Sequence, residues 1–64
     1  MTAREAMARL TREGWSHRPG KGSHTVFSKA GHPRVVVSNH RGDIPPGTLR
    51  SICKAAEWEY PPEA

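Results

Sequence analysis

The chain of 64 residues has little cysteine and no long apolar run. Its single cysteine, Cys53, excludes an internal disulfide and a cysteine-based zinc site. No stretch is apolar enough to span a bilayer or to serve as a secretion signal. A chain this short buries only about 60% of its unfolded surface, which excludes a large enzyme cleft. We therefore expect one small soluble domain in a reducing cytoplasm.

Most hydrolase motifs are also missing. The chain has no Walker loop, no GxSxG elbow and no paired carboxylates at useful spacing. Its histidines lack the HxxxH spacing of a helical zinc site, and Asp43 is the one carboxylate near them. We expect neither a metal ion nor a cofactor.

Positive charge is what the chain does contain. Ten Lys and Arg residues against six Asp and Glu residues give a net charge of +4, with the excess in the middle of the chain. Such a balance favours a polyanionic partner such as nucleic acid. Ordinary solubility charge is the alternative, and composition does not decide between the two.

The chain begins with a helix signal. Thr2 and Glu5 have the spacing of a capping box, which predicts a helix that begins at residue 2 or 3. Apolar residues recur at helical spacing up to Leu10, and Gly14 is the expected stop. The apolar stripe indicates core packing.

Three strands and a second helix should follow. β-Branched and aromatic residues between glycine and proline turns predict strands at 15–18, 23–29 and 34–38, with Trp15 in the core. A helix should begin near residues 44–48, with Asp43 and Thr48 as rival caps, and bury a stripe formed by Leu49, Ile52, Cys53 and Ala56. We expect a domain over residues 1–57 and a short tail over 58–64, whose aromatic residues either cover the core or bind a partner.

This order predicts an α+β fold of the form α-β-β-β-α, a three-stranded antiparallel sheet with both helices on one face. Double-stranded-RNA-binding domains share this layout. Alternation places Phe27 and His24 on opposite faces of the second strand. If Phe27 faces the helices, His24 faces outward.

The segment Lys21-Gly22-Ser23-His24 is the candidate site. Its glycine permits a tight turn, and the turn delivers a hydroxyl and an imidazole to the start of a strand. An imidazole can take or give a proton near neutral pH without a metal, and Lys21 supplies a cation for an anionic substrate. A surface histidine in a basic turn is the alternative.

Several pieces of the chain resemble one family in order and spacing. They are Gly14-Trp15, Gly22-Ser23-His24 followed by Phe27, the run 34–37, His40, and the run 44–52 that contains Pro-Pro-Gly-Thr-Leu. Over residues 2–56 the chain is similar to the HicA toxin family. In that family a proline often lies two residues before the histidine that follows the third strand, whereas Ser38 stands here. Residues 57–60 also differ from the usual glycine and apolar ending.

The resemblance implies a fold like that of double-stranded-RNA-binding domains, ribonuclease activity on mRNA in the cytoplasm, and neutralisation by a HicB-type antitoxin. It also implies that His24 is the catalytic residue. We expect no membrane partner and no direct contact with DNA.

The mechanism that we expect uses the RNA 2′-hydroxyl as nucleophile and His24 as general base or general acid. The expected RNA contacts are made by Lys21, Ser23, Arg18, Arg34 and His40. His40 is the first candidate for a second proton-transfer group, and a hydrogen-bonding loop histidine is the alternative. We assign His17 to the strand surface and His32 to a turn.

Two other functions stay open at this point. In a non-catalytic RNA-binding module, His24 would only donate a hydrogen bond to a phosphate. In a protein-binding adaptor, the open sheet face and the aromatic tail would contact another protein, and the chain would have no affinity for RNA at low salt.

Overall fold

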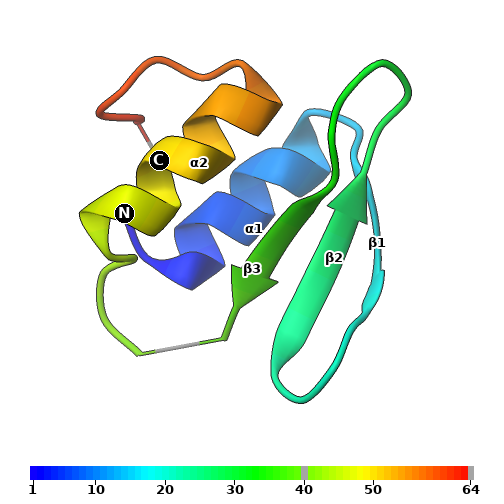
Figure 1. Ribbon diagram of the computed structural model, residues 1–64, viewed down its shortest axis with the longest axis horizontal. Helices are drawn as coiled ribbons and strands as arrows, with labels where there is room; N and C mark the ends of the chain where they lie inside the picture. Colours follow the sequence, from blue (N-terminus) through cyan, green and yellow to red (C-terminus); the bar gives the residue numbers. More distant parts are fainter. Residues whose placement is uncertain (40, 64) are drawn as a thin grey trace.

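The computed structural model describes residues 1–39 and 41–63. Its elements follow one another as a helix, three strands and a helix (Figure 1), which are α1 (Ala3–Arg12), β1 (Ser16–Pro19), β2 (His24–Ser28), β3 (Val35–Ser38) and α2 (Pro46–Ala56). β2 lies in the middle of the sheet and pairs antiparallel with both neighbours. The predicted α+β fold and its element order are confirmed.

A complete capping box starts α1. The Thr2 hydroxyl accepts a hydrogen bond from the Glu5 N–H at 3.1 Å, and the Glu5 carboxylate accepts one from the Thr2 N–H at 2.8 Å. The hydrogen bond from the Thr2 backbone lowers the pKa of Glu5, because it favours the ionised carboxylate. The helix ends at Arg12, and Gly14 follows with φ +90°, as the glycine stop predicts.

Alternation along the strands separates the two faces of the sheet. Phe27, Val35 and Val37 are buried, whereas Val36 remains 48% exposed. Both helices pack on the face that carries these buried residues, and they contact β3 (Figure 1). His24 is exposed at the start of β2, on the opposite face from Phe27. The other face of the sheet is therefore open.

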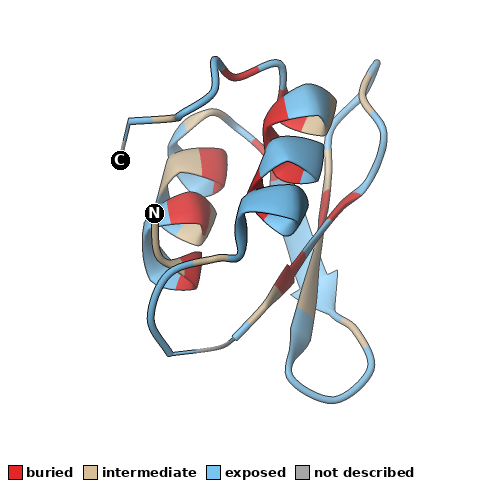
Figure 2. Cartoon of the chain, turned by 60° about the vertical axis from the view of Figure 1, so that its left-hand side comes forward, coloured by how far each residue is buried: buried red, intermediate tan, exposed pale blue. Residues whose placement is uncertain are grey.

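The first strand differs slightly from the prediction. It runs over Ser16–Pro19 instead of 15–18, because the Trp15 N–H donates to the Leu10 carbonyl at the end of α1. The Trp15 side chain is buried in the core, as predicted. All four residues of β1 are exposed, so the helices leave this strand uncovered (Figure 2).

The start of α2 corrects one prediction. Neither Asp43 nor Thr48 caps the helix, because Pro45 is the N-cap residue and no side chain makes a capping hydrogen bond. Pro46 is the first residue of the helix, where its fixed φ suits the helix and its missing N–H leaves one donor fewer to cap. Asp43 instead lies 3.6 Å from the N-terminal amine of Met1 and forms a β-bridge with Thr2.

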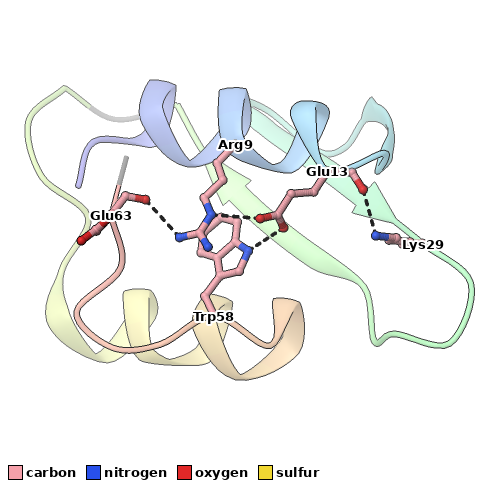
Figure 3. A network of polar contacts seen from close by, with 5 residues as sticks. All are labelled: Arg9, Glu13, Lys29, Trp58 and Glu63. Atoms are coloured by element: carbon pink, nitrogen blue, oxygen red, sulfur yellow. Dashed lines mark hydrogen bonds and ion pairs between the residues drawn. The ribbon is translucent and has the colours of Figure 1, made fainter.

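The segment after α2 folds back over the core. Trp58 is buried, and its indole N–H donates to the Glu13 carboxylate at 2.7 Å (Figure 3). The Arg9 guanidinium lies 4.3 Å from the centre of the indole ring, and its Nε donates to the same carboxylate at 3.0 Å. Of the two roles left open for the tail aromatics, Trp58 has the core-covering one. The domain limits 1–57 and 58–64 stay a prediction.

Candidate nucleic-acid interface

The turn between β1 and β2 positions His24. The Gly20 N–H donates to the His24 carbonyl at 2.8 Å, and the His24 N–H donates to the Lys21 carbonyl at 3.1 Å. Gly22 lies inside this turn with φ +60°, a conformation that residues with a Cβ adopt only at a cost. The glycine-rich sequence thus closes a tight turn that places Lys21 and Ser23 directly before His24.

Gly20 has a different role, because it lies close to the outer face of β2. A Cβ at this position would lie 3.1 Å from a methyl group of Val26 and 3.4 Å from the Cβ of His24. Only a residue without a side chain leaves this contact unstrained. The space beside His24 therefore depends on a glycine at position 20.

Strand register decides which residues share the open face with His24. Arg18 pairs with Val26, two residues along β2 from His24, so Arg18 lies on the same face one row away. Ser38 pairs directly with His24 across β2 and β3. The structure thus adds Ser38 to the neighbourhood of His24, and only the strand register could have identified it.

The predicted site residues do not all gather at one point. Lys21, Ser23 and His24 lie together in the turn and are exposed. Arg34 directly precedes Val35, the partner of Phe27, so it lies about 13 Å along the sheet from the row of His24. It is therefore at the opposite end of the sheet from His24. His40 lies outside the described residues, so its predicted role stays a prediction.

Charge on the strand part of the chain has one sign. Between Glu13 and Asp43 there is no acidic residue, while five basic residues occur: Arg18, Lys21, Lys29, Arg34 and Arg41. Lys29 is engaged in the fold, because its amine donates to the Glu13 carbonyl at 2.8 Å. The concentration of like charge on the sheet and its turns favours the polyanion alternative over evenly spread solubility charge.

The other described histidines, His17 and His32, contact residues of the fold. His32 Nδ1 lies 3.2 Å from the Ala55 carbonyl and 3.3 Å from a Glu57 carboxylate oxygen, so this side chain connects the β2–β3 turn to the end of α2. The His17 ring lies 5.6 Å from the Phe27 ring, on the helix side of the sheet. His24, in contrast, makes no side-chain hydrogen bond or ion pair to another residue of 1–39 or 41–63.

A metal centre finds no support in the part of the chain that the structure describes, where no three His, Cys, Asp or Glu side chains come together as ligands. Cys53 is buried in the core, and burial raises the pKa of its thiol despite the charge of Arg9. It is a core residue, as its helical spacing predicts. No helix among the described residues is long and apolar enough to cross a membrane.

Fold and site together define a small α+β protein that presents a basic, histidine-bearing sheet face. A family model described as "HicA toxin of bacterial toxin-antitoxin" matches residues 3–58 of the chain. The chain therefore belongs to the HicA toxin family of toxin-antitoxin systems. The comparison with curated proteins gives no match.

Proposed function

We propose that the protein is an endoribonuclease toxin that cleaves mRNA without a metal ion and uses His24 as a general acid or base. The observation that carries this proposal is the free, exposed imidazole of His24 at the start of β2, beside the Lys21 turn. Membership of a toxin family supports it, because a toxin needs an activity that harms its cell. The basic open face supports a polyanionic substrate.

The chemistry needs few protein groups, because RNA carries its own nucleophile. The 2′-oxygen attacks the neighbouring phosphorus and loses its proton, the bond from phosphorus to the 5′-oxygen breaks, and the leaving oxygen gains a proton. His24 performs one of these two proton transfers, a role that typically contributes about 10² to 10⁴ in rate. His40 is the first candidate for the other transfer.

The cations on the open face have separate tasks in this proposal. Lys21 and the Ser23 hydroxyl lie nearest to His24 and stabilise the negative charge that develops on the phosphate. Arg18 lies one row away and holds the adjoining phosphate. Arg34 lies about 13 Å along the sheet, a distance at which it contacts the backbone of a bound strand further from the scissile bond.

The partner in this proposal is a HicB-type antitoxin in the same cytoplasm. An acidic or apolar antitoxin surface that covers His24 and Lys21 silences the toxin, because it excludes RNA from the face that carries the chemistry. The protein itself makes no direct contact with DNA. Like double-stranded-RNA-binding domains, the protein contacts the phosphate backbone of the RNA and does not read its bases.

One experiment tests the central claim. Labelled single-stranded RNA is incubated, with and without EDTA, with the wild type, with His24→Ala and with His17→Ala, a matched control because His17 lies on the other face of the sheet. We expect the wild type and His17→Ala to cleave, and His24→Ala to lose about 10² to 10⁴ in rate while RNA binding is largely kept.

The same assay separates the alternatives. RNA binding without cleavage by any of the three proteins identifies a non-catalytic RNA-binding module. Cleavage that EDTA abolishes disproves the metal-free mechanism. A chain without RNA affinity at low salt is a protein-binding adaptor, because a basic face that serves nucleic acid binds most tightly when counterions are scarce.

A further inference from the structure

The outer edge of β3 is unpaired. The Asn39 N–H donates to the Ser23 carbonyl, so residues 23 and 39 form a hydrogen-bonded pair. Hydrogen-bonded and non-hydrogen-bonded pairs alternate along an antiparallel ladder, so Val36 and Ser38 belong to non-hydrogen-bonded pairs with β2. The N–H and C=O groups of Val36 and Ser38 consequently point away from β2. No backbone hydrogen bond among the described residues uses these outward groups outside the ladder. They are available to a further strand.

The other edge of the sheet is less open to a further strand. The Gly20 N–H donates to the His24 carbonyl, so on β1 the outward groups belong to His17 and Pro19. Pro19 has no N–H to offer, and prolines commonly protect sheet edges in this way. The two edges therefore differ, and only β3 presents consecutive outward donors and acceptors.

A groove lies between the open edge of β3 and helix α2. Both helices contact β3 (Figure 1), whereas all four residues of β1 are exposed. The helix layer is thus displaced toward β3. Between β3 and α2 lies a groove lined by Val35, Val36, Thr48, Ser51, Ile52 and Ala55. A fourth strand beside β3 would lie along this groove.

We propose that the free edge of β3 binds an extended segment of the antitoxin, which adds to the sheet as a fourth strand. Its backbone pairs with Val36 and Ser38, and its apolar side chains cover the small residues of α2 and the exposed Val36. This inference rests on membership of a toxin-antitoxin family and does not depend on RNA cleavage by His24.

The basic residues around the groove indicate which side chains the antitoxin segment carries. Arg34 is the one charged residue that lines the groove, and Arg50 and Lys54 are exposed on the same helix without an acidic residue between them. Cross-strand pairs of opposite charge stabilise a sheet, and like charges destabilise it. The added segment therefore carries acidic residues near Arg34.

A second copy of this chain fits the edge less well. Strands pair about 4.8 Å apart, whereas packed helices need 8 to 10 Å between their axes. Because α2 lines the groove beside the free edge of β3, a two-fold pairing of β3 with itself would bring the two α2 helices against each other. The net charge of +4 on each copy would also oppose the pairing. An extended segment without a helix of its own avoids both costs.

The location links this anchor to the candidate site. Ser38 pairs with His24, so an added strand lies about 10 Å from His24, two strand spacings across the sheet. An antitoxin anchored there reaches the Lys21 turn across the width of β3 and can cover it with the part that follows the strand.

Hydrogen exchange of the complex tests the proposal. The toxin is purified with the antitoxin encoded beside it after co-expression, and the exchange of single amides is compared with that of the free toxin. We expect the amides of Val36 and Ser38 to become protected in the complex, because each gains a hydrogen bond. The amide of His17, which also points outward but from β1, should exchange equally fast in both states.

A pair of matched variants tests the same contact by affinity. Val36→Pro removes one outward N–H from β3, and His17→Pro removes one from β1, while neither removes a bond of the existing ladder. We expect Val36→Pro to weaken antitoxin binding roughly tenfold and His17→Pro to leave it unchanged. Arg34→Gln should weaken binding and reduce its salt dependence, with Arg4→Gln on α1 as the control.

Three outcomes would overturn the proposal. They are an absence of protection at Val36 and Ser38, equal binding by the two proline variants, and a failure of the co-expressed proteins to associate. Amide protection limited to His24 and Lys21 would agree with an antitoxin that covers the candidate site, but it would exclude an added strand beside β3. Since RNA is absent from these assays, a failure of the proposed ribonuclease activity does not affect the result.

Discussion

Gly22 illustrates how one residue shapes the candidate site. Its φ of +60° lies in the left-handed region, and a Cβ built at this position meets no atom within 4 Å. A substitution therefore costs backbone strain and no steric clash. Gly20 is the opposite case, because its Cβ would press on Val26 and His24 in an otherwise ordinary conformation. The two glycines of the turn are needed for different physical reasons.

Replacement of Gly22 by alanine should consequently destabilise the protein by about 1 kcal/mol, the cost of a Cβ in the left-handed region. Asparagine tolerates this region better, so Gly22→Asn should cost less than Gly22→Ala. Urea unfolding followed by circular dichroism measures both differences. Equal stability of Gly22→Ala and the wild type would contradict the assigned backbone conformation.

At the scale of elements, α1 and the C-terminal segment are joined by one polar network. Glu13 accepts hydrogen bonds from Trp58 and Arg9, and the Arg9 guanidinium also donates to the Glu63 carbonyl at 3.0 Å (Figure 3). Burial acts to raise the pKa of Glu13, but these hydrogen bonds and the charges of Arg9 and Lys29 outweigh it. The pKa of Glu13 is therefore below its ordinary value of 4.5.

The lowered pKa gives a prediction with a definite sign. Because the folded state favours the ionised form, Glu13 stabilises the protein at pH values above 4.5, and this contribution is lost as the pH falls through the lowered pKa. Glu13→Gln should thus be less stable than the wild type at pH 7, and the difference should shrink in acid. Thermal unfolding from pH 7 to pH 3 measures it.

Glu59→Gln provides the control for this comparison, because Glu59 is exposed and forms no ion pair with the described residues. The stability of Glu59→Gln should equal that of the wild type from pH 7 to pH 3. A stability difference between Glu13→Gln and the wild type that stays constant or grows toward acid would show that the carboxylate does not stabilise the fold through its charge.

For the whole molecule, the distribution of charge makes the proposed RNA binding testable by its dependence on salt. The strand region carries basic residues only, whereas the acidic residues occur in α1 and at its C-cap, at position 43 and after α2. A bound RNA strand releases one counterion for each phosphate that a cation neutralises. Affinity should therefore fall steeply as the salt concentration rises.

Arg18→Gln should reduce the slope of log K against log salt by about 0.7, the value for one phosphate of a single strand. Arg4→Gln should leave the slope unchanged, because Arg4 lies on α1, away from the open face. Fluorescence anisotropy with labelled RNA between low and moderate salt measures both slopes. Equal changes in the two variants would place the RNA elsewhere.

Local signals were sufficient for most of the elements. The capping box at Thr2, the alternation around Phe27 and the glycine at 14 act within a few residues, so the sequence alone predicts the first helix and the order of the strands. The start of α2 was predicted with the wrong cap, because Pro46 at the first helical position has no N–H that needs a capping side chain. His24 was identified from its turn and its place on the strand.

Contacts between distant parts of the chain could not be predicted in this way. The pairing of Ser38 with His24, the burial of Trp58 against Glu13 and the open edge of β3 depend on which segments meet after folding. Periodicity assigns a residue to a face but not to a neighbour across the sheet. The sequence therefore determines the elements and the position of His24 at the start of a strand. The tertiary structure decides which residues surround His24, because register and helix placement result from packing of the whole core.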